Sequence, residues 1–290
     1  MGRFLSYLAS ERGLSTNTLD AYRRDMEDAM RFFAEHPPAT IETAQSDQWT
    51  HFFRNASQRS LSTKTVARRV ATARTFLRFQ AVLGRDVDDI LARIDRPKPE
   101  RDLPHILSRE QVVRLISAPD PASPLYFRDV AVMELLYASG LRASELCELR
   151  VNDVNLAVGF VRVLGKGHKE RIVPVGKAAA QAIRHYLDQC RGNLMRTQTD
   201  QLFLSRTGRA MERVGLWQLI QKMAVRAHLV NEVSPHVLRH CFATHLLGGG
   251  ADLRVVQELL GHADVGTTQI YTHVDTTRLK HIHSTYHPRK

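Results

Sequence analysis

The pattern of apolar and polar positions predicts a chain that is mostly helical. Between Ser62, which can cap a helix, and Gly84, which can end it, apolar side chains return every three or four residues. These positions are Val66, Val70, Ala73 and Leu77. An earlier helix is expected to start at Ser15 or Thr16 and to stop before the Pro37–Pro38 pair. The segment that holds both patterns is predicted to be all-helical.

The rest of the chain combines helical patterns with one hairpin. In FVRVLGKGHKERIVPV apolar residues alternate with polar ones on both sides of Gly165, which predicts two strands joined by a tight turn. Helical patterns occupy EQVVRLISA, RDVAVMELLYASG, LRASELCEL, KAAAQAIRHYLDQC, LWQLIQKMAVRAHL, HVLRHCFATHLLGGG and DLRVVQELLG. We therefore predict a mainly α fold with a small antiparallel β-sheet in the C-terminal domain.

A proline-rich stretch divides the chain. RPKPERDLPH, which begins at residue 96, has three prolines among five charged residues, a composition that disfavours both helix and strand. We place a linker over 96–107, between a helical N-terminal domain of residues 1–95 and a larger domain of residues 108–290. A length of 290 residues suits two domains that each bury a core.

Composition narrows the class of protein. Hydrophobic residues make up 43% of the chain, which argues against disorder, collagen and coiled coil. No run of about 18 apolar residues predicts a membrane span, and the N-terminus lacks the apolar stretch of a secretory signal. Three scattered cysteines suit a reduced, cytoplasmic protein better than a disulfide scaffold.

The positive charge of the chain is concentrated in one region. The net charge is +11, and residues 48–85 contain no Asp or Glu. Such a block indicates a polyanionic partner, most simply nucleic acid, although a solvated basic face would look the same. On the helix after Ser62, Arg68 and Arg78 share a stripe with small residues that would let it approach a phosphate backbone. We expect Lys64, Arg68 and Arg78 to contact DNA.

Several short motifs could carry chemistry, and each alone has an ordinary structural explanation. His236 and Arg239 are three residues apart, so they share a helix face and can address one small target. Glu145 follows Arg142 at the same spacing and can orient its guanidinium, as common helix ion pairs also do. Lys166 stands between two glycines at the hairpin turn, which could equally be an ordinary turn.

Two more candidates lie further along the chain. His262 follows a helix-ending glycine, and Tyr271 lies in a mixed polar segment where it could also be a half-buried aromatic residue. A zinc site at His236, His240 and His245 lacks the glutamate of the HExxH motif and any cysteine pair. The glycine-rich hairpin also lacks P-loop spacing, so we expect neither a metal nor a cofactor.

The motifs taken in order resemble those of one family. GLRASEL, GKGHKER, SPHVLRHCFATHLL and LLGHADVGTTQIYTH together resemble the tyrosine recombinase, or phage integrase, family. The resemblance covers nearly the whole chain and is strongest to the Xer recombinases of bacteria. TLDAYRRDM and the closing HPRK are similar to the XerD group within them. The resemblance implies a two-domain, C-shaped clamp around duplex DNA.

The resemblance also implies a catalytic set, which is Arg142, Lys166, His236, Arg239, His262 and Tyr271. Tyr271 would attack the phosphorus and form a 3′-phosphotyrosyl link, releasing a 5′-hydroxyl without metal or ATP. Arg142 and Arg239 would clamp the non-bridging oxygens, and Lys166 would protonate the leaving oxygen. His236 would assist proton transfer, His262 would donate a hydrogen bond to the phosphate, and Glu145 would support Arg142.

The resemblance implies partners as well. These are duplex DNA, a related XerC-like recombinase in a heterotetramer on two duplexes, and a septal DNA translocase, with chromosome dimers resolved at a dif-like site. The C-terminal helix, whose His281, His283 and His287 are interpreted as a helix tail rather than a site, would dock on a neighbouring subunit. Removal of residues 277–290 is therefore expected to spare folding of the monomer but to impair synapsis or coordinated cleavage.

Alternative functions remain open at this stage. They are a phage- or plasmid-type integrase or resolvase, a topoisomerase with the same chemistry, and a non-catalytic DNA-binding protein on the same scaffold.

Overall fold

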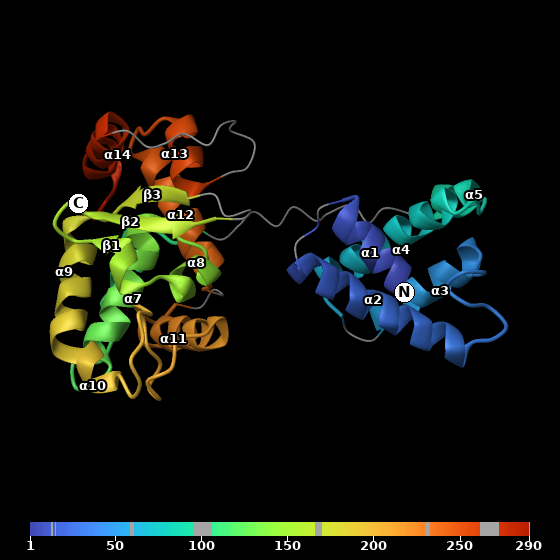
Figure 1. Ribbon diagram of the computed structural model, residues 1–290, viewed down its shortest axis with the longest axis horizontal. Coiled ribbons are helices and arrows are strands. Elements are labelled where there is room, and N and C mark those ends of the chain that lie inside the picture. The colour runs from blue at the N-terminus through green and yellow to red at the C-terminus, as the bar shows by residue number, and fades with distance from the viewer. Residues whose placement is uncertain are drawn as a thin grey trace. The chain divides into compact units, whose positions relative to one another are not determined.

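The computed structural model divides into two compact units, Met1–Asp102 and Leu103–Lys290 (Figure 1). It describes residues 1–12, 14, 16–58, 61–94, 106–165, 170–229, 233–261 and 273–289. Each unit has its own hydrophobic core.

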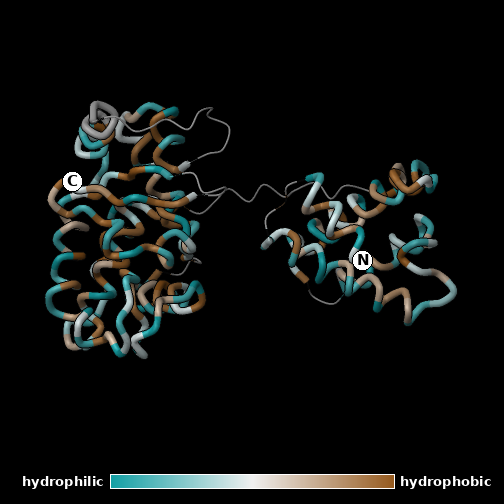
Figure 2. Tube along the Cα trace, in the orientation of Figure 1, coloured by the Kyte–Doolittle hydropathy of each residue, from teal (hydrophilic) through white to brown (hydrophobic). Residues whose placement is uncertain are grey.

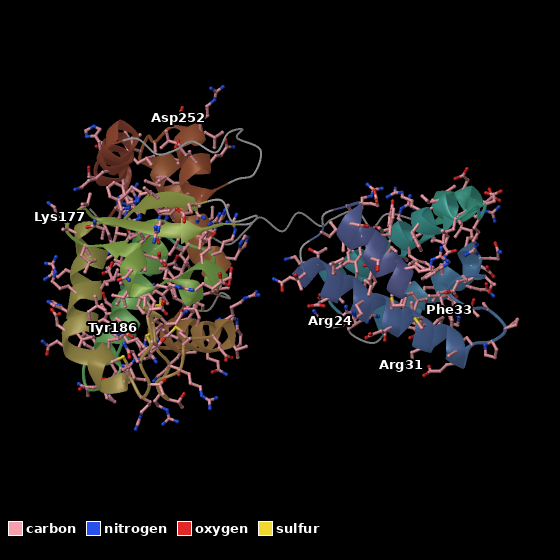
Figure 3. All side chains as sticks on the ribbon, viewed as in Figure 1. Arg24, Arg31, Phe33, Lys177, Tyr186 and Asp252 are labelled. Atoms are coloured by element: carbon pink, nitrogen blue, oxygen red, sulfur yellow. The ribbon has the colours of Figure 1, made fainter. Side chains whose placement is uncertain are left out.

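The regular elements in the described part of the first unit are all helices, as the apolar pattern predicts. Its helices are α1 (Gly2–Ser10), α2 (Thr16–Glu35), α3 (Ser46–Gln58), α4 (Thr63–Val82) and α5 (Asp88–Arg93). Aromatic side chains fill the core, where Phe33 (labelled in Figure 3) meets the Trp49 ring edge to face with centroids 5.0 Å apart. Such aromatic pairs bury large apolar areas, which a small helical unit needs.

Helix α4 follows its sequence prediction closely. The Ser62 side chain accepts a hydrogen bond from the Thr65 N–H, and so caps the helix. Val70, Ala73 and Leu77 are buried, whereas Ala71 and Arg78 on the opposite side are exposed. In Figure 2 the tube changes between brown and teal along the helices, as expected where one helix face is buried.

The second unit is built around α7 (Tyr126–Ser139), whose residues from Ala131 onward are all buried. Helices α9 (Lys177–Tyr186) and α12 (Pro235–Gly248) pack against it. The remaining α-helices are α6 (Arg109–Ile116), α8 (Ala143–Glu148), α10 (Gly192–Leu194), α11 (Arg213–Arg226), α13 (Leu253–Leu260) and α14 (His273–Tyr286). Tyr186, labelled in Figure 3, accepts a hydrogen bond at its buried hydroxyl from the Leu204 N–H at 3.1 Å.

The strands form a three-stranded antiparallel sheet in the described part of this unit. They are β1 (Val154–Asn155), β2 (Phe160–Leu164) and β3 (Glu170–Pro174), in the order β1-β2-β3. Leu164 pairs with Glu170, which confirms the predicted hairpin between the last two strands.

The C-terminal helix α14 packs against β3 and α12 of its own unit (Figure 1). Leu279, His283 and His287 are buried there. The expectation that removal of residues 277–290 spares folding is therefore wrong. It assumed that the segment does not contribute to the core of its own unit, whereas these three side chains are buried there.

Candidate active site

Helix α7 ends next to the site, in a turn that requires glycine. Gly140 ends the helix in the left-handed conformation, with φ = +57°. A Cβ atom at this position would lie 2.4 Å from the Phe242 ring, so no other residue fits. Arg142 then occupies the position immediately before the first turn of α8 (Ala143–Glu148).

Arg142 is held on one side and open on the other. Its backbone N–H donates to Glu145 Oε2 at 2.7 Å, and its Nη1 donates to Glu145 Oε1 at 2.7 Å. Nη2 donates to the carbonyl of Gly261 at 3.3 Å. The side chain keeps 41% of its surface exposed, so an oriented guanidinium faces solvent.

Arg239 reaches the same place from α12. Ser234 caps this helix and Pro235 occupies its first position. The Nη1 atom of Arg239 donates to the Gly140 carbonyl at 2.7 Å, and Nη2 donates to the Leu260 carbonyl at 2.6 Å. His236 lies exposed one turn earlier on α12.

These side chains surround a hollow of about 420 Å³. Its lining residues are Arg142, Ala143, Arg213, Ser234, Pro235, His236 and Arg239. Three arginines therefore face one cavity, which suits a phosphate. Arg213, at the start of α11, is a member that no sequence pattern had indicated.

Arg171 ends the GKGHKER motif, but the motif did not indicate its role at the site. From β3, its Nη1 and Nη2 each donate to one oxygen of Glu145 at 2.8 Å, and its Nε donates to the Leu259 carbonyl at 3.1 Å. The signal was in the strand pattern, since Arg171 occupies the same buried face as Val173. A charged residue at an apolar register position indicates a buried partner.

The electrostatics of the cluster favour an anion. Burial by itself would raise the pKa of Glu145, but Arg171 and then Arg142 outweigh it and lower the pKa to about 2. Burial, followed by repulsion from Arg142, lowers the pKa of Arg239 to about 10, so it stays charged at pH 7. Arg142, Arg171 and Arg239 against the one carboxylate of Glu145 leave a formal charge of +2. Arg213 adds a further positive charge at the cavity.

Three of the predicted catalytic residues, Lys166, His262 and Tyr271, lie outside the described residues. Of the other predicted site residues, the structure brings Arg142, Glu145, His236 and Arg239 together around or beside one cavity.

The predicted DNA-contact residues of the first unit differ in their surroundings. Lys64 and Arg78 are exposed on α4. Arg68 instead forms an ion pair with the buried Asp25 and donates to the Ala21 carbonyl at 3.1 Å.

Other arginines of the basic block 48–85 are also engaged within the unit. Arg69 pairs with Asp28 at 2.7 Å, Arg74 donates to the carbonyls of Leu91 and Ile94, and Arg85 donates to that of Ala44. Ion pairs with acidic side chains thus neutralise some arginines of the block, and hydrogen bonds to carbonyl groups fix others in place. It is not the single free face that the charge pattern suggested.

The histidines considered for zinc do not form a cluster. His245 is buried and its Nδ1 is hydrogen-bonded to the Tyr137 hydroxyl at 2.8 Å. Among the described residues, no group of three or more His, Cys, Asp or Glu side chains could hold a metal ion. Within that same part of the chain, none of the helices has the length and apolar character to cross a membrane.

Comparisons with known proteins agree with this geometry. Residues 105–278 match the Phage integrase family, and residues 1–82 match its N-terminal SAM-like domain. The chain is 42% identical to tyrosine recombinase XerD of Listeria monocytogenes serovar 1/2a, over 99% of this chain and 97% of the relative. It is 40% identical to tyrosine recombinase XerD of Staphylococcus haemolyticus, with the same shares of each chain covered.

A solved structure shares the fold. The XerH site-specific recombinase, bound to its palindromic difH substrate after cleavage, superposes with a TM-score of 0.71 at 22% identity. The alignment covers 94% of this chain and 81% of that one. The match to the family domains over most of the chain, together with 42% identity to a relative along almost its full length, shows that this chain belongs to the phage integrase family and is a XerD-like tyrosine recombinase.

Proposed function

We propose that this chain cuts and rejoins DNA at a specific site through a 3′-phosphotyrosyl intermediate on Tyr271. The observation that carries the proposal is the arginine cluster at the end of α7, where Arg142 and Arg239 are oriented on one cavity. Two fixed guanidinium groups neutralise the charge of a phosphodiester and the further charge of its transition state.

The chemistry of cleavage is a transesterification. The Tyr271 oxygen forms a bond to phosphorus while the bond to the 5′-oxygen breaks, and Lys166 gives that oxygen a proton. His236 assists proton transfer at the nucleophile, and His262 donates a hydrogen bond to the phosphate. The phosphotyrosyl link preserves the bond energy, so a 5′-hydroxyl can reverse the step without ATP.

The biological setting of the proposal follows from the relatives. Several are named XerD, and a structural neighbour is bound to a difH substrate. We assign this chain to chromosome-dimer resolution at a dif-like site in the cytoplasm during cell division. It would act in a heterotetramer with an XerC-like partner on two duplexes, with a septal translocase as activator. Both units would contact the duplex, through the active-site cavity in one and through Lys64 and Arg78 in the other, since Arg68 is engaged by Asp25.

A covalent-adduct assay tests the chemistry. The full chain is incubated in EDTA with a nicked duplex that carries a dif-like core site, and the products are separated on a denaturing gel. A protein–DNA adduct is expected for the wild type and none for Tyr271→Phe. Specific DNA binding without an adduct, even after a XerC-like partner is added, would contradict the proposal.

A further inference from the structure

The C-terminal segment lies against the end of the helix that leads to the active site. The last turn of a helix leaves carbonyl groups without partners inside the helix, and when buried these need other donors. At the end of α7 the Tyr137 carbonyl accepts from His287 Nε2 at 3.2 Å, and the Ala138 carbonyl accepts from His283 Nε2 at 2.7 Å. Two residues after Ala138, the Gly140 carbonyl accepts from Arg239 Nη1 at 2.7 Å.

Both imidazoles act as hydrogen-bond donors. A carbonyl oxygen can only accept, so Nε2 of each ring carries the hydrogen. At His287 the other nitrogen, Nδ1, accepts from the Arg289 N–H at 3.2 Å, which agrees with this tautomer. Burial lowers the pKa of His283, and burial together with the repulsion that a protonated His283 would exert lowers the pKa of His287 to about 3. The two rings are therefore neutral at pH 7.

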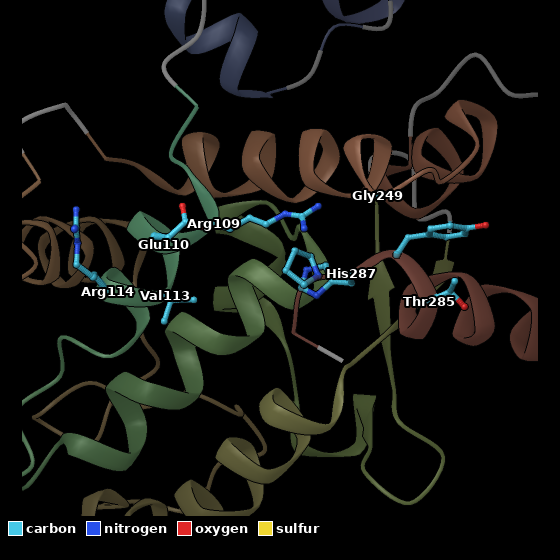
Figure 4. A pocket seen from close by; sticks show the side chains of 9 residues that line it. Arg109, Glu110, Val113, Arg114, Gly249, Thr285 and His287 are labelled. Atoms are coloured by element: carbon cyan, nitrogen blue, oxygen red, sulfur yellow. The ribbon is translucent and has the colours of Figure 1, made fainter.

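The two histidine rings also pack against each other and against neighbouring aromatic rings. Their rings stack at 4.5 Å with 13° between the planes, and His287 also lies 4.8 Å from the Tyr137 ring. His287 lines a cavity of about 760 Å³, and Figure 4 shows the side chains around it. His287 itself is fully buried. Phe242 contacts both rings and also fills the space beside Gly140.

A third side chain ties the same segment to α7. Arg289 pairs through two hydrogen bonds with Glu134, one turn before Tyr137. The tail thus contacts positions 134, 137 and 138, which share one helix face. Two residues after this face ends, the chain turns at Gly140 and presents Arg142.

We propose that His283 and His287 are positioning residues for the recombination reaction: they fix the carboxyl end of α7 and thereby the placement of Arg142 and Arg239. The inference rests on the proposed function of this site. Loss of either donor leaves a buried carbonyl unpaired and lets the last turn of α7 fray. The Gly140 turn and both guanidinium groups would then lose their fixed geometry, and small misplacements of this kind cost rate rather than binding.

The decisive variants differ in one hydrogen bond. His283→Leu removes the donor and keeps most of the volume, whereas His283→Gln can restore an amide N–H near the position of Nε2. His281→Leu, at an exposed position of the same helix, is the matched control. The first readout is the single-turnover rate of adduct formation on nicked dif-like DNA at saturating protein, measured beside the affinity for the same DNA.

The expected result is a cleavage rate lowered about tenfold or more in His283→Leu, with binding changed less than twofold. His283→Gln should recover most of the rate, and His281→Leu should match the wild type. A methylphosphonate at the scissile position has no charge for the arginines to neutralise, so the deficit should shrink on that substrate. An equal deficit on both substrates, or no loss of rate, would overturn the proposal.

Amide hydrogen exchange gives a readout that is independent of activity. The Gly140 N–H donates to the Leu136 carbonyl, and the Arg142 N–H donates to Glu145. Both amides should exchange faster in His283→Leu than in the wild type, and not in His281→Leu. If the wild type forms no adduct, the proposed function fails, while unchanged exchange at these two amides would sink the positioning role on its own.

Discussion

Glu145 is a buried carboxylate that accepts hydrogen bonds from two arginines of the site. Its pKa of about 2 lies below the ordinary 4.5, so the ionised form is the one that folding favours. Its contribution is therefore present above about pH 4.5 and is lost as the pH falls toward 2. Glu145→Gln leaves the buried Arg171 without its carboxylate and should lower the free energy of unfolding by about 3 kcal/mol at pH 7.

Urea unfolding of wild type and variant at pH 7 and at pH 3 checks this prediction at the residue scale. The difference in unfolding free energy between the two proteins should be smaller at pH 3. At that pH Glu145 is already protonated in the unfolded wild type, so its ionised form contributes less to folding. Glu148→Gln, at an exposed position on the same short helix, should change neither value appreciably. A difference that stays constant across the two pH values would contradict the role given to ionised Glu145.

At the element scale, helix α14 has a stabilising role in its own unit. Removal of residues 277–290 would strip Leu279, His283 and His287 from the core and leave Glu134 buried without Arg289. Loss of one partner of a buried pair costs about 3–5 kcal/mol, before the apolar contacts are counted. The melting temperature of the truncated chain should fall by well over 5 °C. His281→Ala should leave it unchanged, and a truncated chain as stable as the wild type would refute this role.

The helices differ in how far the sequence could predict them. The helices with clear apolar periodicity and caps, such as α4 and α12, were predicted because their signals are local. Helix α3 was not singled out, since its buried Trp49 and Phe52 stand among polar residues. Arg171 was missed because its partner Glu145 is 26 residues away in the chain, a pairing that only tertiary packing creates.

At the scale of the whole molecule, the number of basic residues in the block 48–85 overstates the number of cations available to DNA. Arg68 and Arg69 form ion pairs with Asp25 and Asp28, whereas Lys64 and Arg78 are exposed. Each side chain that binds a phosphate contributes about 0.9 to the slope of log affinity against log salt. Neutralising Lys64 and Arg78 together with glutamine should therefore reduce that slope by about two and weaken binding.

Arg68→Gln distinguishes a loss of DNA-binding charge from a loss of stability in the same experiment. The Arg68 guanidinium already pairs with Asp25 and donates to the Ala21 carbonyl. Its replacement leaves a buried carboxylate with one partner fewer, so we expect a lower melting temperature with a smaller change in slope. Titrations of dif-like duplex from about 50 to 200 mM salt, with thermal melts of each variant, provide both measurements. If Arg68→Gln lowers the slope by a full unit, Arg68 binds a phosphate after all. If the double variant leaves the slope unchanged, Lys64 and Arg78 do not bind phosphates.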